Sequence, residues 1–341
     1  MPLLPEHSAP QHERAPRPLP LFLELVREVS ERDPELARSA LAGLRTYEQA
    51  PRRERPAAKP EIARVAGASL RDHGGTGPPA LLVPSLINPP RILDLDGEVS
   101  LTGAISHMGR RVLLLDWGKA DERSSLSVRG HIEELLLPLL RELGQPVALI
   151  GYCLGGTMAI AAAKPAPVER IVTIAAPWKF SAYSEASTRA LADMWRHSEC
   201  AARQLGALPM EVLQAAFWSL DPDRTVRKFA EFGRLDAESD EARRFVELEE
   251  WANEGEPLPY PAAKELIEDL FGRDLPGSGQ WIASDELTVP ALHFTADHDR
   301  IAPAATAPAG EKVAIPSGHV GMIVGSARER LHEALADFLN H

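Results

Sequence analysis

The sequence predicts an α/β fold, in which a mostly parallel β-sheet carries helices on both of its faces. Short apolar runs alternate with segments of helical spacing after residue 60, as buried parallel strands alternate with crossover helices. The hydrophobic content of 44% is enough for a core of this kind. The expected strands are 80–84, 111–116, 147–151, 171–175, 289–295 and 312–316.

Each strand is assigned from a run of Val, Ile, Leu or Ala that a turn residue ends. The first three runs stop at Pro84, Asp116 and Gly151, which are typical of the ends of buried strands. Helices are expected over 127–143, over the small-residue segment 155–163 and, to close the chain, over 327–339.

Three regions are expected along the chain. Residues 1–60 form an N-terminal arm of short helices and a Pro-rich linker, in which Asp33 caps a second helix that starts with proline. Residues 61–341 form the α/β domain. Within it, about 178–286 breaks the strand–helix rhythm, is mostly helical and holds five of the six tryptophans. An insertion of this size after a core strand predicts a lid over the active site.

Charge and cysteine content exclude several classes of protein. The formal net charge of -12 disfavours binding to nucleic acid or to an anionic membrane surface. Two cysteines do not make a disulfide framework or a cysteine-based zinc site. No secretory leader, membrane span or glycine-rich phosphate loop is found, so we expect a cytoplasmic protein that uses neither a metal nor a cofactor.

The segment 151–156, Gly-Tyr-Cys-Leu-Gly-Gly, lies between an apolar run and a small-residue helix. This is the nucleophile-elbow pattern of the α/β-hydrolase fold, with Cys153 in the position of the usual serine. The flanking glycines relieve contacts around a strained backbone, and the helix N-terminus favours a thiolate. The Leu154 N–H is then one oxyanion donor. The alternative interpretation is a buried structural cysteine.

A catalytic base and its orienting acid are expected after the nucleophile in the chain. His319, on a Gly-flanked loop after the last strand, is the predicted base, and His298 and His293 are weaker candidates. Asp299 is the predicted acid, with Asp297 as its close rival on the same loop. Only 19 residues separate Asp299 from His319, so the helix between the last two strands is expected to shrink to a turn.

The second oxyanion donor is expected in the loop after the first predicted strand. Leu86 and Ile87 are both candidates, and the sequence does not choose between them. Candidates for substrate binding are Asn88 in the same loop, Tyr152 beside the nucleophile and Trp178 at the start of the insertion.

These motifs resemble the polyhydroxyalkanoate synthase family, whose members have a Cys-type α/β-hydrolase fold. The resemblance covers roughly residues 60–340, and Asp299 and His319 fall on the family's catalytic Asp and His motifs. The length and the Asp-Trp-Gly sequence resemble the shorter synthases that work with a second subunit. The segments that carry the resemblance are VPSLIN (83–88), ILDL (92–95), VLLLDWG (112–118) and GYCLGGT (151–157).

The resemblance implies an acyltransferase that forms a covalent acyl-Cys153 intermediate from a 3-hydroxyacyl-CoA. It also implies a second synthase subunit or a homodimer as partner, and association with polymer granules in the cytoplasm. One alternative is a Cys-dependent α/β hydrolase acting on an ester or thioester, since the elbow is also similar to that of dienelactone hydrolases. A second alternative is a non-catalytic granule-associated scaffold, which the presence of all three catalytic residue types disfavours.

Overall fold

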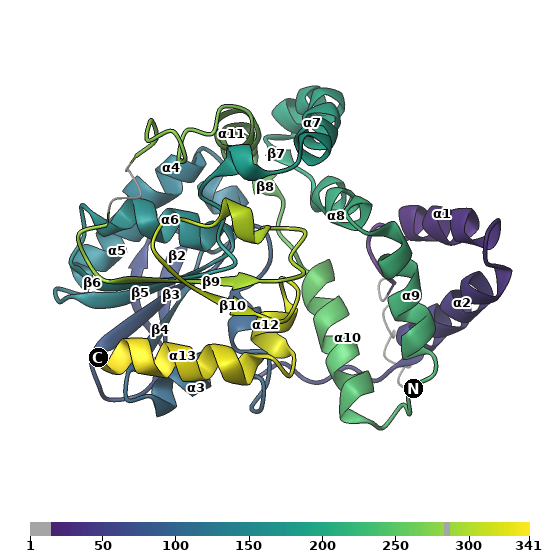
Figure 1. The fold of residues 1–341 in the computed structure, drawn as a ribbon, viewed down its shortest axis with the longest axis horizontal. Helices are drawn as coiled ribbons and strands as arrows, with labels where there is room; N and C mark the ends of the chain where they lie inside the picture. The colour runs from purple at the N-terminus through teal and green to yellow at the C-terminus, as the bar shows by residue number, and fades with distance from the viewer. Residues whose placement is uncertain (1–14, 283–286) are drawn as a thin grey trace, which may run out of the picture. The chain divides into compact units, whose positions relative to one another are not determined.

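The computed structural model describes residues 15–282 and 287–341 of the 341-residue chain. The chain divides into two compact units, which are described separately. The first unit combines the N-terminal segment up to Pro56 with Leu213–Asn253. The second unit, Ala57–Val212 with Glu254–His341, contains the β-sheet (Figure 1).

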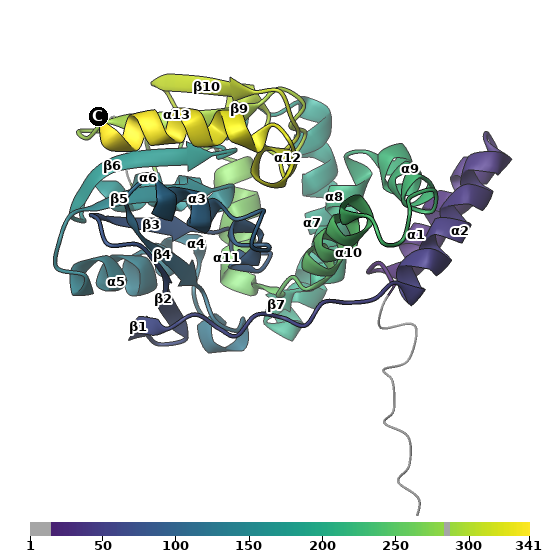
Figure 2. The ribbon, with the colours of Figure 1, turned by 90° about the horizontal axis from the view of Figure 1, so that it is seen from below.

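The second unit is built on an eight-stranded sheet with the order β1-β2-β4-β3-β5-β6-β9-β10, which Figure 2 shows from one edge to the other. All pairs from β4 to β10 are parallel, whereas β1, β2 and β4 pair antiparallel. The mostly parallel sheet confirms the predicted fold class. The strands are β1 (Glu61–Val65), β2 (Ala68–Gly74), β3 (Pro79–Val83), β4 (Arg111–Asp116), β5 (Val147–Tyr152), β6 (Val168–Ile174), β9 (Ala291–Ala296) and β10 (Glu311–Ile315).

The central strands are apolar along their whole length because helices cover both faces of the sheet. Every residue of β3 and β5 is buried. Helices α3 and α13 lie on one face, and α6 lies beside η4 and α5 on the other (Figure 1). These helices are α3 (Leu101–His107), the continuous segment α4 (Val128–Gly130), η4 (His131–Leu136) and α5 (Leu137–Glu142), α6 (Leu154–Ala163) and α13 (Arg328–Asn340).

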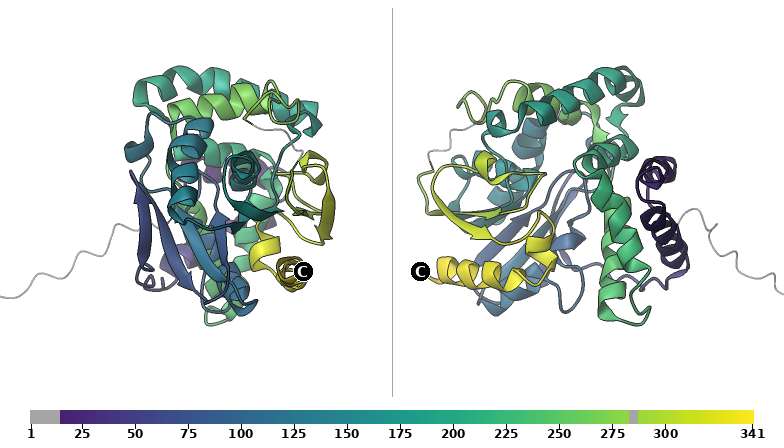
Figure 3. Two further views of the ribbon diagram at one scale, coloured as in Figure 1. Left: turned by 90° about the vertical axis from the view of Figure 1, so that its left-hand side faces the viewer. Right: turned by 45° about the vertical axis from the view of Figure 1, so that its right-hand side comes forward.

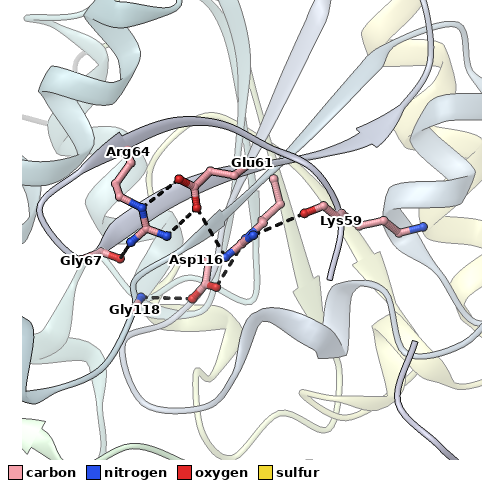
Figure 4. Close-up of polar contacts among 7 residues, drawn as sticks. Lys59, Glu61, Arg64, Gly67, Asp116 and Gly118 are labelled. Carbon is pink, nitrogen blue, oxygen red and sulfur yellow. Dashed lines mark hydrogen bonds and ion pairs between the residues drawn. The ribbon is translucent and has the colours of Figure 1, made fainter. Parts of the chain in front are cut away.

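The antiparallel hairpin β1–β2 is an edge of the sheet that the sequence analysis missed. Its outward side chains are charged, and they form a polar network at the end of β4 (Figure 4). Arg64 pairs with Glu61, and the Arg71 guanidinium lies 3.6 Å from Glu61 and 3.8 Å from Asp116. Charged residues suit an edge strand, but they hide it from a search for apolar runs.

The connection between β9 and β10 contains only the short 3-10 helix η7 (Ala304–Thr306). This confirms the expected loss of a full helix between the last two strands. The short connection brings the turns that follow β9 and β10 together at the carboxyl edge of the sheet, since neighbouring parallel strands end on the same side.

The segment between β6 and β9 is mostly helical and contributes to both units. Its first and last parts belong to the sheet-containing unit, whereas 213–253 belongs to the first unit. The two-stranded pairing of β7 (Ala207–Leu208) with β8 (Leu258–Pro259) ties the two ends of the excursion together. The helices of this segment are α7 (Glu185–Leu205), α8 (Met210–Ser219), α9 (Pro222–Phe232), α10 (Asp240–Asn253), α11 (Tyr260–Lys264) and η6 (Glu265–Phe271).

The first unit is a helical cluster in which α1 (Leu19–Ser30) and α2 (Pro34–Gln49) pack with α9 (Figure 3). As predicted, Asp33 caps α2, and its side chain accepts a hydrogen bond of 2.9 Å from the Leu36 N–H. Helices α2 and α9 approach closely at Gly43, where a Cβ would lie 1.8 Å from the Phe229 carbonyl oxygen.

In the described part of the chain, no helix is both long and apolar enough to cross a bilayer.

Candidate active site

Cys153 lies on the turn between β5 and α6 with φ 55° and ψ -131°, a strained conformation for a residue other than glycine. The neighbouring glycines make this turn possible. A Cβ on Gly151 would lie 2.4 Å from the Gly156 Cα, and one on Gly155 would lie 2.1 Å from the Val83 carbonyl oxygen. The Cys153 side chain is therefore presented, partly exposed, at the carboxyl edge of the sheet.

Asp299 and His319 meet at the same edge, from the turns after β9 and β10. Asp299 Oδ2 accepts a hydrogen bond of 2.7 Å from His319 Nδ1. Asp299 Oδ1 accepts hydrogen bonds of 2.8 Å from the N–H groups of Ile301 and Ala302. The Asp299 side chain is 0% exposed and that of His319 is 9% exposed. Two backbone donors thus orient the carboxylate, which in turn orients the imidazole.

His319 also interacts with Cys153, since the charge of the thiolate favours the charged imidazole ring. Burial alone lowers the pKa of His319, because it penalises the charged ring. The attraction of Cys153, together with the charge and hydrogen bond of Asp299, outweighs burial and raises the pKa of His319 to about 10. The imidazolium form is therefore favoured at neutral pH, next to the sulfur of Cys153.

The rival residues lie elsewhere. Asp297 and His298 are exposed on the turn after β9, where their backbone N–H groups bond the carbonyls of Ile315 and Ser317. His293 is buried within β9, and its Nδ1 lies 2.8 Å from the Thr173 hydroxyl. Among the candidate acids and bases, the structure brings only Asp299 and His319 to Cys153.

Three backbone N–H groups at the ends of the neighbouring strands β3 and β5 bear on oxyanion binding. Leu154 is the first residue of α6, and Leu86 and Ile87 lie in the loop after β3. Within residues 15–282 and 287–341, the N–H groups of these three residues have no hydrogen-bond acceptor. Donors left unbonded in this way can bind a negatively charged oxygen.

The candidates for substrate binding have different environments. Tyr152 is buried, and its ring centroid lies 5.2 Å from that of His319. Burial, followed by the charges of Cys153 and Asp299, raises the pKa of the Tyr152 phenol. Trp178 is fully buried, 6.3 Å from the Trp281 ring, whereas Asn88 is partly exposed. Contact of these residues with substrate stays a prediction.

Tyr183 is a residue of the site that the sequence analysis missed. Its hydroxyl donates a hydrogen bond of 2.8 Å to the Ile301 carbonyl, in the turn that holds Asp299. Burial, then the charges of Cys153 and Asp299, raise the pKa of the Tyr183 phenol. Its ring lies 4.8 Å from that of Phe271. The signal available in the sequence was its place shortly after β6, since the carboxyl ends of parallel strands form such sites.

No cluster of three or more His, Cys, Asp or Glu side chains suited to a metal occurs among the residues that the structure describes. The groups available at this site are a cysteine side chain, a histidine paired with an aspartate, and unbonded backbone donors. This set can attack a carbonyl carbon, stabilise the resulting oxyanion and deliver a proton to the leaving group.

Comparison with known proteins finds several that are similar to this chain in sequence. No protein-family model matches the chain. The chain is 27% identical over 298 residues to the poly(3-hydroxyalkanoate) polymerase subunit PhaC of Haloarcula marismortui, covering 78% of this chain and 61% of that protein. It is 26% identical over 290 residues to PhaC of Allochromatium vinosum, covering 77% of this chain and 80% of that protein. The chain thus spans less than two thirds of the length of the haloarchaeal relative.

Solved structures with the same fold include a hydrolase from Pseudomonas aeruginosa PA01, with a TM-score of 0.54 and 17% identity over 84% of this chain and 100% of the other. Epoxide hydrolase A from Mycobacterium thermoresistibile matches with a TM-score of 0.52 and 17% identity over 82% and 98%. At this identity the likeness concerns the fold. The chain therefore has the α/β-hydrolase fold and is related in sequence to the poly(3-hydroxyalkanoate) polymerase subunits PhaC.

Proposed function

We propose that the protein is an acyltransferase that forms an acyl-Cys153 thioester from a 3-hydroxyacyl-CoA, as a polyhydroxyalkanoate synthase does. The observation that carries this proposal is the Asp299–His319 hydrogen bond of 2.7 Å beside a cysteine on a strained strand–helix turn. The sequence relationship to the PhaC subunits supports the choice of substrate class.

In the first step, the Cys153 thiolate attacks the thioester carbonyl carbon and the carbonyl π electrons move to oxygen. The Leu154 N–H and a donor from the 86–87 loop stabilise this oxyanion. When the carbonyl re-forms, the carbon–sulfur bond to CoA breaks, and His319 gives its proton to the CoA sulfur. One thioester replaces another, so the step has little free-energy cost.

In the second step, the hydroxyl of another hydroxyacyl unit or of a growing chain attacks the acyl-Cys153 carbonyl. The neutral His319 left by the first step takes the hydroxyl proton, an ester bond forms and the Cys153 thiolate leaves. Asp299 stabilises the imidazolium that is restored. If water takes the place of the hydroxyl, the same intermediate yields a free hydroxy acid, which is the hydrolase alternative.

Three further proposals concern the setting of this site. The insertion of about 178–286 acts as a lid, and residues 1–60 form an N-terminal arm ahead of the α/β domain. A second synthase subunit or a second copy of the chain is the proposed partner. The proposed location is the cytoplasm, at the surface of polymer granules, where the product of the reaction accumulates.

The test is a product assay with 3-hydroxybutyryl-CoA. We expect release of CoA, a mass increase on Cys153 equal to a hydroxybutyryl group, and turbidity from polymer. Cys153→Ala should abolish all three, whereas Cys200→Ala, at the exposed second cysteine, should retain them. Free hydroxybutyrate as the only product would refute the synthase proposal and support the hydrolase alternative. Absence of any Cys153 adduct with full CoA release would refute the acyl-enzyme.

A further inference from the structure

The loop after β3 is held through its carbonyl groups. The Pro84 carbonyl accepts a hydrogen bond of 3.1 Å from Trp117 Nε1, and the Leu86 carbonyl accepts one of 3.4 Å from Arg123 Nη2. The Ile87 carbonyl accepts a hydrogen bond of 3.0 Å from the backbone N–H of Glu256. All three carbonyls are bonded, whereas the N–H groups of Leu86 and Ile87 have no acceptor in the described part of the chain.

Arg123, which bonds the Leu86 carbonyl, is a charged residue whose side chain is almost fully buried. It ends the short 3-10 helix η3 (Asp121–Arg123) and is 3% exposed. Among the described residues it has no carboxylate within ion-pair distance, and its Nε has no hydrogen-bond partner. A buried guanidinium without a paired carboxylate is costly. Burial lowers the pKa of Arg123 more than the charges of Glu256 and Asp116, beyond ion-pair distance, raise it.

Those contacts are neutral acceptors. Arg123 Nη1 lies 3.0 Å from His131 Nε2, and His131 Nδ1 lies 2.7 Å from the Ser127 carbonyl. Since that carbonyl can only accept, Nδ1 carries the proton and Nε2 accepts from Arg123. Burial, more than any other cause, lowers the pKa of His131 to about 4, so the ring is neutral near pH 7. The guanidinium fork is thus divided between an imidazole and the Leu86 carbonyl.

The direction of one peptide group follows from this bond. The C=O of Leu86 and the N–H of Ile87 belong to the same peptide unit, and in a trans peptide they point in opposite directions. Arg123 holds the C=O on its own side, so the Ile87 N–H faces away from Arg123. The Ile87 carbonyl, which Glu256 holds, fixes the next peptide plane and so limits rotation of the loop.

We propose that Arg123 is a positioning residue of the oxyanion hole, which fixes the Leu86–Ile87 peptide so that the Ile87 N–H is the second donor beside Leu154. This inference rests on the proposed acyl-Cys153 chemistry. Arg123 touches neither substrate nor nucleophile and acts through the Leu86 carbonyl. The proposal chooses Ile87 over Leu86 as the second oxyanion donor, a choice that the sequence left open.

The test compares two reactions of the same sulfur. Acylation of Cys153 by 3-hydroxybutyryl-CoA passes through an oxyanion, whereas alkylation by iodoacetamide does not. In Arg123→Met we expect the acylation rate to fall about 10- to 100-fold, less than the loss of a whole oxyanion donor. The alkylation rate should stay within about twofold, because the Cys153–His319–Asp299 set is untouched.

Arg110→Met is the matched control. Arg110 is 6% exposed and, like Arg123, bonds a backbone carbonyl, that of Leu339, but it also pairs with Glu169 and lies before β4, at the amino edge of the sheet. Arg110→Met removes a buried guanidinium together with its ion pair to Glu169, so its cost in stability is at least that of Arg123→Met. The ratio of acylation to alkylation should therefore remain that of the unmodified protein, even if the melting temperature falls.

A second variant covers the case in which Arg123→Met does not fold. Arg123→Lys keeps the charge, but a compact ammonium cannot hold His131 and the Leu86 carbonyl together as the planar fork does. We expect a folded protein whose acylation-to-alkylation ratio is reduced severalfold. If the unmodified protein acylates normally and the ratio is unchanged in either folded Arg123 variant, the role of Arg123 is refuted, but the proposed function is not. Failure of the unmodified protein to acylate overturns the proposed function itself.

Discussion

Replacement of Asp299 by asparagine tests the catalytic assignment most directly. Asp299→Asn keeps the size of the side chain and an oxygen that can accept from the N–H groups of Ile301 and Ala302. It removes the negative charge, and it can turn an amide N–H₂ toward His319 in place of an acceptor. The Asp299 side chain is 0% exposed, so water cannot replace the lost acceptor.

The size of the effect follows from the environment of His319. Its pKa of about 10, against an ordinary value of 6.5, favours the imidazolium by a net of roughly 5 kcal/mol, which remains after Cys153 and Asp299 have offset the cost of burial. Losing the Asp299 contribution lowers the pKa of His319 and allows the wrong ring tautomer. The corresponding change in a serine–histidine–aspartate triad costs about 10⁴ in kcat, so we expect a loss of about 10²- to 10⁴-fold in acylation.

The assay is the rate of CoA release in the first turnover, measured beside the His319 titration by NMR. Asp297→Asn is the matched control, because Asp297 is exposed on the same turn. We expect that variant to change the rate by no more than about twofold. A similar loss at both positions, or a larger loss at Asp297, would refute the assignment of Asp299 and the argument from burial.

Three further predictions follow from individual contacts. Tyr183→Phe removes the 2.8 Å hydrogen bond to the Ile301 carbonyl. Such a bond contributes about 1 kcal/mol, so we expect acylation to slow roughly fivefold. An unchanged rate would show that this bond does not help to position Asp299. Gly43→Ala places a Cβ against the Phe229 carbonyl and should lower the free energy of unfolding by about 1–3 kcal/mol in urea, which an unchanged midpoint would disprove. The raised pKa of His319 means that its stabilisation is full below about pH 6.5 and is lost as the pH rises through about 10. The difference in unfolding free energy between the unmodified protein and His319→Gln should therefore shrink over that range, and a difference that grows would reverse the sign of the argument.

Local patterns in the sequence were sufficient for the fold class and for the place of Cys153 on its strand–helix turn. Buried parallel strands are continuous apolar runs, so β3, β5 and β6 could be found one at a time. The glycines around Cys153 are needed for close backbone contacts within a few residues of the turn, and this makes the elbow visible as a short motif. The brief β9–β10 connection was likewise evident from residue spacing alone.

Other features depend on contacts between distant segments. The hairpin β1–β2 is charged at the edge of the sheet, so no apolar run marks it. The association of 213–253 with α1 and α2 depends on helix packing, which amphipathic spacing does not specify. Tyr183 acquires its place only because the turn after β9 folds against it.

The sequence by itself determined a cysteine on a strand–helix turn, followed by an acid and a base on later strand ends. It did so because backbone strain and strand burial leave marks on neighbouring residues. Only the tertiary structure distinguished buried Asp299 from exposed Asp297, two residues away on the same turn, since that difference lies in which side chain faces His319. It alone also brought Arg123 to the Leu86 carbonyl, because a hydrogen bond across 37 residues of chain has no local signature.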